Sequence, residues 1–571
     1  MANFYTDNND LVFHLTNPKM ERIVKLKEND FKNREESEIS PINIEDAMDN
    51  YKRVLEIAGE ISGDVIAPNA EMVDKEGPTL SDNYVHYAKG TDENMDILKK
   101  AGIMGMTLPI KYGGLNFPTT VYCMAVEMIS RADASLMNLF GLQDIAETIK
   151  EFATEEIKEE YLPRFASGES TGAMILTEPD AGSDLQAVNM KASLDKDGVW
   201  RLNGVKRFIT NGNAKLSLIL ARSEEDTTDG RGLSMFLYER DKTITVRRIE
   251  DKMGIHGSPT CELVYKDSPA ILIGKRKFGL IKYVMALMNG ARIGVSCQAV
   301  GIAEAAYREA FKYADERIQF GKKINRFPGV FEMLTDMKIK IDAARTLLYE
   351  TARFIDIYKE YDEIAKERPL TPTEKKELKK YRKRSEVLTP LLKGISSEYC
   401  NQVTYDAVQV HGGTGFMRDF PVERLYRDAR ITSIYEGTTQ LQVIAAVKGV
   451  SGGIFNELLR EYQNVEIKPE LEFLTKILKT MTDEYKATIK MVDDANDIEF
   501  TSFHSRRLVE MFGNIIMGYL LTFDADRETE YKFKSIAELF LKKAQSENRE
   551  KFSYIRKSQI KDMSLYKKFA I

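Results

Sequence analysis

The chain has 571 residues, 43% hydrophobic and 30% charged, a composition typical of a globular protein with several domains and large apolar cores. A net charge of −6 gives no general attraction to nucleic acid or to anionic membranes. The sequence also argues against a metal site or a disulfide framework, because its five histidines are dispersed and its four cysteines lie far apart, at Cys123, Cys261, Cys297 and Cys400. With no secretory signal at the N-terminus, a cytoplasmic protein is expected.

The chain is expected to pass from an extension into helices. Residues 1–41 are polar and charge-dense and are interpreted as an extension on the surface of the fold. In residues 42–165 apolar side chains recur every three to four residues, which predicts an N-terminal α-helical domain.

The periodicity changes in residues 166–277. Short β-rich runs such as LSLILARS and GLSMFLYER alternate with turn residues, which predicts a central, barrel-like β domain. Asp197–Gly198 and Asn203–Gly204 are both expected to form hairpin-type turns, since these dipeptides favour the left-handed backbone of such turns.

Helices are expected again in residues 278–453, a C-terminal helical domain with a charged insert near 360–390. In this insert Thr371 and Glu374 are predicted to form a capping box. The basic run of the insert is interpreted as a solvated helix face, with a docking surface for an acidic partner as the alternative.

Residues 454–571 are predicted to form an extra C-terminal helical domain. Its most apolar stretch, GNIIMGYLL, is interpreted as a buried helix and not as a membrane span. Just before this domain, Thr438 or Thr439 is expected to cap a helix that Gly449 ends. The fold class is therefore α+β and mostly α, with a β domain between helical regions.

Two stretches of the β domain carry residue types suited to hold a flat ring or a phosphate. In ILTEPDAGSD, Thr177 stands at a strand end and Ser183 lies in a turn whose backbone N–H groups can donate to a flavin edge or a phosphate. In FITNG, Phe208 can stack on a ring, and Thr210 follows two residues later. Each stretch alone also suits an ordinary polar loop.

The helical region adds a glycine-rich loop and a candidate phosphate clamp. QVHGGTGF, at residues 409–416, does not follow a strand as a GxGxxG turn does, so a Rossmann-type site is excluded by context. Gly412 and Gly413 still permit close approach of a pyrophosphate. Arg317 in DERIQFG is either a phosphate clamp, with Phe320 as a stacking surface, or part of a helix-end salt bridge.

The stretch RDARITSIYEGTTQLQ carries a candidate catalytic base. Glu436 has apolar bulk before it, at Tyr435, and room for a planar group after it, at Gly437. Partial desolvation raises the pKa of such a carboxyl. On these residues alone, a turn glutamate stabilised by the dipole of the following helix is the favoured interpretation.

In their order along the chain, these motifs resemble the acyl-CoA dehydrogenase family of flavoproteins. LTEPDAGSD is similar to the family's first signature, and QVHGGTGF with DFPVERLYRDAR to its second, while RFITNG, RIQFGKKI and IYEGTTQLQ match further segments. The resemblance covers roughly residues 42–450. The charged insert, the C-terminal unit and HGSPTCEL resemble the long subgroup that includes the 3-methylmercaptopropionyl-CoA dehydrogenase type.

The resemblance implies FAD as a tightly held, non-covalent cofactor. Residues matched to contacts with the flavin ring are Thr177, Phe208 and Thr210. Those matched to the adenine end of an FAD in a neighbouring subunit are Arg317, Phe320, Gln409 and Gly413, and the chain would return to FAD at Thr438 and Gln440. Ser183 would lie between the flavin and the thioester arm, and the further substrate contacts would be Asn289, Arg292, Tyr435 and Gly437.

The resemblance also makes Glu436 the catalytic base. It would remove the α-proton of an acyl-CoA while hydride passes from Cβ to flavin N5, giving a trans-2-enoyl-CoA. The implied partners are an electron-transfer flavoprotein and further copies of the chain, as a dimer or a dimer of dimers, with no nucleic acid and no membrane span. The alternatives are an acyl-CoA oxidase that uses O₂ and a non-catalytic assembly factor that binds FAD or CoA.

Three positions differ from the family pattern or leave two interpretations. Ile175 stands where the first signature usually has a small residue, and Asn289 where members often carry aspartate. His256 either lines the mouth of the active site or is a loop histidine bonded to backbone, the favoured interpretation.

Overall fold

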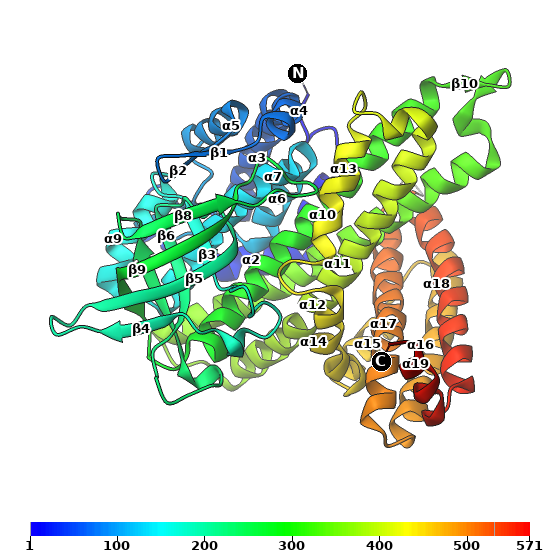
Figure 1. Ribbon diagram of the computed structural model, residues 1–571. Helices are drawn as coiled ribbons and strands as arrows, with labels where there is room; N and C mark the ends of the chain where they lie inside the picture. The colour runs from blue at the N-terminus through cyan, green and yellow to red at the C-terminus, as the bar shows by residue number, and fades with distance from the viewer. Residues whose placement is uncertain (1, 530–531, 571) are drawn as a thin grey trace. The chain divides into compact units, whose positions relative to one another are not determined.

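The computed structural model describes residues 2–529 and 532–570, which divide into two compact units (Figure 1). Unit 1 comprises the chain up to residue 306 together with residues 413–432. Unit 2 comprises residues 307–412 and the chain from residue 433 onward.

The N-terminal part of unit 1 is helical. Residues 2–41 are more firmly anchored than a surface extension, because Leu11, Ile23 and Val24 are fully buried. The elements of this part are α1 Asn9–Leu15, α2 Lys19–Lys27, α3 Ile44–Ile61, α4 Ala67–Glu76, the short strands β1 Thr79–Ser81 and β2 Tyr84–His86, α5 Lys89–Lys100, α6 Thr119–Ala132, α7 Ala134–Gly141, α8 Ile145–Phe152 and α9 Glu155–Ala166.

A seven-stranded sheet follows and closes on itself. Strand β6 pairs with β7 at one edge and with β4 at the other, and the ring continues through β5 and β9 back to β7. Strand β3 runs parallel to β6, and β8 pairs with β9. The strands are β3 Gly172–Ile175, β4 Lys191–Leu194, β5 Trp200–Thr210, β6 Leu216–Arg222, β7 Leu233–Glu239, β8 Ile244–Ile249 and β9 Thr260–Ile273.

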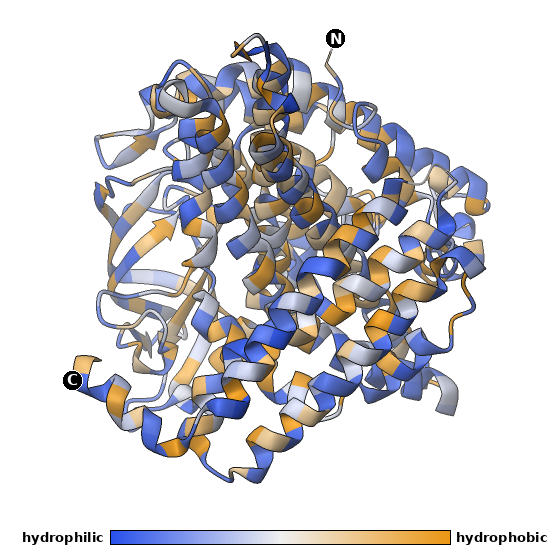
Figure 2. Ribbon diagram, turned by 90° about the vertical axis from the view of Figure 1, so that its right-hand side faces the viewer, coloured by the Kyte–Doolittle hydropathy of each residue, from blue (hydrophilic) through white to orange (hydrophobic). Residues whose placement is uncertain are grey.

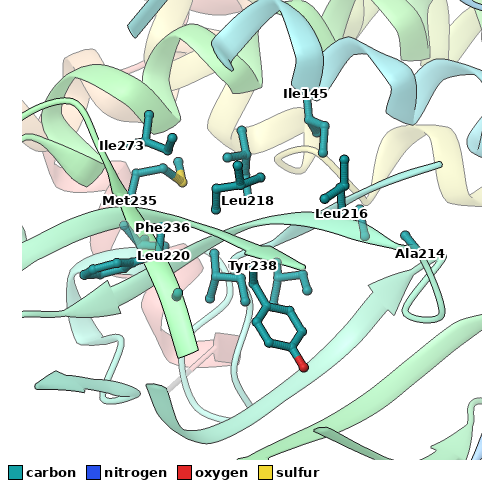
Figure 3. Packing of buried hydrophobic residues seen from close by; sticks show 14 of the residues in the cluster. Ile145, Ala214, Leu216, Leu218, Leu220, Met235, Phe236, Tyr238 and Ile273 are labelled. Carbon is teal, nitrogen blue, oxygen red and sulfur yellow. The ribbon is translucent and has the colours of Figure 1, made fainter. Parts of the chain in front are cut away.

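The core of this barrel packs on both faces of β6 and β7. In Figure 3, Leu216 and Leu218 lie on the side that faces Ile145 of α8, and Tyr238 lies on the opposite side. All four side chains are at most 1% exposed. Burying one such side chain contributes roughly 1.5–3 kcal/mol, so the barrel is a rigid support for the loops at its ends.

One of the two predicted turns in the barrel is wrong. Asp197–Gly198 connects β4 to β5 as expected, but Asn203–Gly204 lies within β5. There the register against β9 shifts, and Gly204 has φ 153°. The Asn203 amide pairs instead with Asp267, donating to its carboxylate at 2.9 Å and accepting from its backbone N–H at 2.9 Å, so the dipeptide forms a bulge and not a reversal.

Unit 1 is completed by the residues of α10 (Met285–Glu316) up to 306 and by α13 (Val422–Ala429). Unit 2 is built on two 40-residue helices, α11 Pro328–Glu367 and α12 Pro372–His411, which pack against each other. The predicted capping box is present: the Glu374 backbone N–H donates to Thr371 Oγ1, and the Glu374 carboxylate accepts from the Thr371 N–H.

The remaining helices of unit 2 pack onto this pair. They are α14 Thr439–Ser451, α15 Asn456–Gln463, α16 Glu472–Asp494, α17 Ile498–Arg527, α18 Lys532–Lys557 and α19 Met563–Ala570, and a short arm before α11 carries β10 Ile318–Gln319 and β11 Lys322–Lys323. By length and composition α17 could cross a membrane, but 89% of its apolar window is buried, as in a core helix. On the long helices facing the viewer in Figure 2, hydrophilic and hydrophobic residues alternate at helical spacing.

The predicted end of α14 is wrong. Thr438 caps the helix as expected, accepting from the Leu441 N–H, but the helix continues past Gly449 to Ser451. Gly449 serves helix packing, since a Cβ there would lie 2.3 Å from a methyl group of Val387 on α12. The predicted fold class, mostly helical with a central barrel-like β domain, is confirmed.

Candidate active site

Within unit 1, the structure brings together three of the predicted flavin contacts. The loop after β3 is tied to β5 by a hydrogen bond from the Arg207 N–H to the Thr177 carbonyl at 3.0 Å. Phe208 lies at a second register shift of β5, has φ 59° and is 52% exposed, and Thr210 ends the strand. Within the described residues, neither threonine hydroxyl makes a hydrogen bond. Two free hydroxyls flanking an exposed aromatic ring fit a polar, flat ligand.

A buried ion pair fixes the start of this loop. Lys206 Nζ lies 2.9 Å from the Glu178 carboxylate and donates to the Leu176 carbonyl at 2.7 Å. Burial lowers the pKa of Lys206 to about 8. The Glu178 carboxylate also accepts from the Asn189 and Met190 N–H groups, so the polar atoms are satisfied although the pair is buried.

The remaining predicted residues of unit 1 lie on a loop and two helical segments. Ser183 is exposed, and within the described residues its hydroxyl makes no hydrogen bond. On α10, Arg292 is 8% exposed and donates to the Asn289 side-chain oxygen at 3.0 Å, so Asn289 orients the guanidinium. Gly413 is exposed and has open space where a Cβ would be. Ile175 is buried in the barrel core.

His256 belongs to a charged network of unit 1, in agreement with the favoured interpretation. Its Nε2 is 2.7 Å from the Lys252 carbonyl, and its Nδ1 is 3.0 Å from the Asp74 carboxylate. The hydrogen bond with Asp74 raises the pKa of His256. Arg427 of α13 donates to the same aspartate at 2.7 Å and to Glu423 at 2.8 Å, which ties α13 to α4.

In unit 2, the predicted adenine-end residues gather at one end of the long helices. Tyr313, near the end of α10, stacks on His411, the last residue of α12, with ring centroids 4.3 Å apart. Arg317 and Gln409 are therefore carried to the same end, and both are exposed. Phe320, at the tip of the β10–β11 arm, has φ 49° and is 94% exposed.

Glu436 stands in a tight turn before α14. It has φ 55°, and Gly437 has φ 94°, so two successive residues adopt left-handed backbone conformations. A non-glycine residue in this region costs about 1–3 kcal/mol and persists only where its surroundings hold it. Tyr435, Glu436, Gly437 and Thr438 are all partly exposed, and Gln440 is exposed on the first turn of the helix.

Two buried side chains hold this turn by its carbonyl oxygens. Lys393 of α12 donates to the Gly437 carbonyl at 2.7 Å. Gln442 of α14 donates to the same oxygen at 2.9 Å and to the Glu436 carbonyl at 3.1 Å. Because a hydrogen bond with a charged donor contributes about 1.5–3 kcal/mol, these contacts offset the strain of the turn.

The comparisons with known proteins cover most of the chain. Family models of the acyl-CoA dehydrogenase N-terminal, middle and C-terminal domains match residues 50–169, 173–268 and 281–450. A further family model, described as "Acyl-CoA dehydrogenase C terminal", matches residues 451–563. An acyl-CoA dehydrogenase of Bacillus subtilis is 35% identical over 398 residues, which is 68% of this chain and 94% of that protein. The chain belongs to the acyl-CoA dehydrogenase family. The predicted resemblance and the predicted enzyme class, an oxidoreductase acting on CH–CH bonds, are thereby confirmed.

Other relatives within the family differ in their named reactions. An acryloyl-CoA reductase (NADH) of Anaerotignum propionicum is 35% identical, over 67% of this chain and 90% of its own. A 3-methylmercaptopropionyl-CoA dehydrogenase of Ruegeria pomeroyi, the type named for the long subgroup, is 32% identical over 69% of each chain.

Solved structures of the family agree with the fold. Butyryl-CoA dehydrogenase from Megasphaera elsdenii is 34% identical and has a TM-score of 0.59, covering 69% of this chain and 96% of its own. A chain from work on the electron transferring flavoprotein of Acidaminococcus fermentans is 34% identical, with a TM-score of 0.61 over 70% and 97%. An acyl-CoA dehydrogenase from Bacillus anthracis, solved with FAD, matches the fold over 89% of this acyl-CoA dehydrogenase chain and 88% of its own, with 24% identity and a TM-score of 0.73. FAD is thus confirmed as a cofactor of the family.

Sequence reasoning missed the residues that support the predicted site. These residues are the buried polar side chains of Lys206 in a strand and of Lys393 and Gln442 in two helices. The partners of the two lysines lie 28 to 44 residues away along the chain, and those of Gln442 only 5 to 6 residues away. The one available signal for Lys393 was a lysine among the apolar residues of PLLKGIS, a position where an unpaired charge would be costly.

Proposed function

We propose that this acyl-CoA dehydrogenase family member uses FAD to oxidise an acyl-CoA thioester to a trans-2-enoyl-CoA, with Glu436 as the base for the α-proton. The observation that carries the proposal is the Glu436 turn. A carboxylate is retained at the position that matches the family's base, and two buried donors hold its backbone in a strained conformation. Strained backbone of this kind clusters at functional sites, so the supported turn favours a functional role for Glu436.

The residues present fit FAD. Thr177 and Thr210 offer free hydroxyls beside the exposed Phe208 ring, as a flavin edge requires. By resemblance to the family, Thr438 and Gln440 at the start of α14 would also contact FAD. When bound, FAD supplies the two-electron acceptor for the hydride that leaves Cβ.

The chain's own residues would position the acyl-CoA so that its α-proton can be removed. A proton α to a thioester is removed readily only when donors stabilise the charge that develops on the carbonyl oxygen. Glu436 would take that proton on its carboxylate, and Gly437 beside it leaves space for the thioester. Arg292, oriented by Asn289, would bind the CoA portion, and Ser183 would contact the thioester arm.

We propose a homodimer or a dimer of dimers as the working form. Several apolar side chains on the arm and on the neighbouring parts of α10, α11 and α12 are exposed: Phe311, Ile318, Phe320, Phe331 and Tyr405. A second copy would cover this surface, and Arg317, Phe320 and Gln409, with Gly413, would then reach the adenine end of the FAD of that copy. The electron acceptor proposed is an electron-transfer flavoprotein, in the cytoplasm.

A second candidate is reduction of an enoyl-CoA. The acryloyl-CoA reductase among the relatives favours it, because the same base and cofactor serve both directions of one reversible reaction. The sequence alternatives, an oxidase and a non-catalytic FAD- or CoA-binding scaffold, have no such supporting relative among those described above.

The test is an anaerobic titration of the purified protein with a panel of acyl-CoA thioesters. A yellow protein that releases FAD on denaturation, and whose bound flavin is bleached by at least one thioester, supports the proposal. A colourless protein that cannot be reconstituted with FAD would rule out the cofactor, and bound FAD that no thioester bleaches would favour the scaffold. Rapid reoxidation of reduced protein by enoyl-CoA would favour the reductase, and peroxide formed at the full turnover rate the oxidase.

A further inference from the structure

We propose that Lys393 and Gln442 are positioning residues for the catalytic base. They hold two consecutive carbonyl oxygens of the Glu436–Gly437 turn and thereby set the direction in which the Glu436 carboxylate points. The inference rests on the proposed role of Glu436, and its test is designed to fail separately from that role.

Lys393 reaches the turn from a rigid element. It lies within the fully buried stretch of α12, between Leu392 and Gly394, and its Nζ is 2.7 Å from the Gly437 oxygen. Burying an ammonium group is costly unless it is hydrogen-bonded, so a lysine among apolar neighbours indicates a specific partner. The turn carbonyl is such a partner.

Gln442 reaches the turn from α14, the helix that follows it. It is 1% exposed, and its Nε2 donates to the carbonyls of both Glu436 and Gly437. A Cβ at Gly437 would lie 2.6 Å from this nitrogen, so glycine at that position is what admits the amide. Donors from α12 and α14 therefore meet at one left-handed turn.

The hydrogen bonds act on the backbone torsions that aim the carboxylate. Fixing a carbonyl oxygen fixes ψ of its residue, so the bond to the Glu436 oxygen limits rotation directly at the base, and the bonds to Gly437 limit the next residue. Misplacing a reacting group by about 1 Å can slow a reaction by about 100-fold. Loss of either donor should consequently affect the proton-transfer step more than substrate binding.

A third contact anchors the first residue of α14. Thr439 Oγ1 donates to the Glu398 carboxylate of α12 at 2.7 Å, and Arg506 of α17 lies 3.8 Å from that carboxylate. These contacts hold the helix start but touch neither carbonyl of the turn. Substitution of Thr439 should therefore have a smaller effect on kcat than substitution of Lys393 or Gln442.

The test compares Lys393→Met and Gln442→Met with Lys448→Met and Gln402→Met. Methionine keeps the length of the side chain and removes the donor. The control residues are exposed on α14 and α12 and make no contact with the turn. For each full-length variant, FAD content, thermal midpoint, and kcat and KM with a substrate that bleaches the wild type are measured.

We expect kcat to fall by about 10- to 100-fold in Lys393→Met and Gln442→Met, with KM and FAD content close to the wild-type values and the controls unchanged. Adding either change to Glu436→Gln should cause no further loss. Rates within about twofold of the wild type, or a loss that accompanies raised KM or lost FAD, would overturn the inference. An inactive Glu436→Gln alongside normal Lys393→Met and Gln442→Met would contradict positioning only, whereas a fully active Glu436→Gln would contradict the proposed function itself.

Discussion

The proposed base, Glu436, depends on the conformation of its backbone and on the residues that hold it. Its φ of 55° places it in a region that glutamate rarely adopts, and the supports are a lysine and a glutamine that no sequence motif linked to it. The role proposed for Glu436 could be inferred from the sequence, because the motifs around it resemble those of a family. Its supports could not be assigned to it, because the lysine in PLLKGIS indicates only that some partner exists, and hydrogen bonds to carbonyl oxygens leave no pattern that names the partner.

His256 provides a prediction about pH. Its pKa is raised mainly by the hydrogen bond to Asp74, while partial burial and, to a smaller extent, the charge of Arg427 act in the opposite direction. A group whose pKa is raised in the folded state stabilises the protein fully below its unfolded pKa, about 6.5, and less as the pH rises through its folded pKa. The loss of stability in His256→Gln should thus be largest near pH 5.5 and shrink by pH 8.5, as measured by thermal unfolding.

The control for this prediction is His86→Gln. His86 is exposed in the short strand β2, where its ring hydrogen-bonds the Ser81 hydroxyl and packs edge-on against Tyr84. Its substitution should show no comparable trend with pH. A loss of stability in His256→Gln that stays constant from pH 5.5 to 8.5 would mean that the ion pair with Asp74 does not form.

At the scale of elements, the sequence predicted most strands and helices but misplaced features that depend on packing. Asn203–Gly204 has the local signal of a hairpin turn, yet pairing of β5 with β9 and the Asn203–Asp267 contacts keep it within a strand. Gly449 has the local signal of a helix end, yet it lies where α14 meets Val387. In both places a tertiary contact overrides the local preference.

The close approach at Gly449 can be tested directly. Gly449→Ala would place a Cβ 2.3 Å from a branched side chain that has little freedom to move. We expect a destabilisation of about 1–3 kcal/mol by denaturant unfolding. Gly329→Ala, near the start of α11 and in open space, is the control and should be neutral. Equal stability of the two variants would show that α14 and α12 can separate without cost.

The β10–β11 arm carries a prediction about assembly. Phe320→Asp places a charge on a side chain that is 94% exposed in the single chain and that a second copy would cover. We expect a shift toward monomer in sedimentation velocity and a lower FAD content. Phe473→Asp, on the exposed face of α16, should change neither property. A Phe320→Asp protein that keeps its assembly and its FAD would place the interface elsewhere.

At the scale of the whole molecule, the order of helices, barrel and helices is what the family resemblance and the hydrophobic periodicities predicted together. The C-terminal residues 451–563 match a separate domain model of the same family. They carry no motif for chemistry, and the structure shows α17 packed on α11 and α14. These helices are thus part of unit 2, which also carries Glu436.

The central claim is that Glu436 removes the α-proton, and anaerobic bleaching of Glu436→Gln tests it most directly. Glutamine keeps the size and the backbone of the turn but cannot accept the proton. We predict wild-type FAD content with bleaching slowed by about 100- to 10,000-fold, the range that a positioned base contributes. Glu457→Gln, at an exposed position of α15, should bleach as the wild type does. Bleaching of Glu436→Gln at the wild-type rate would contradict the account and place the base elsewhere.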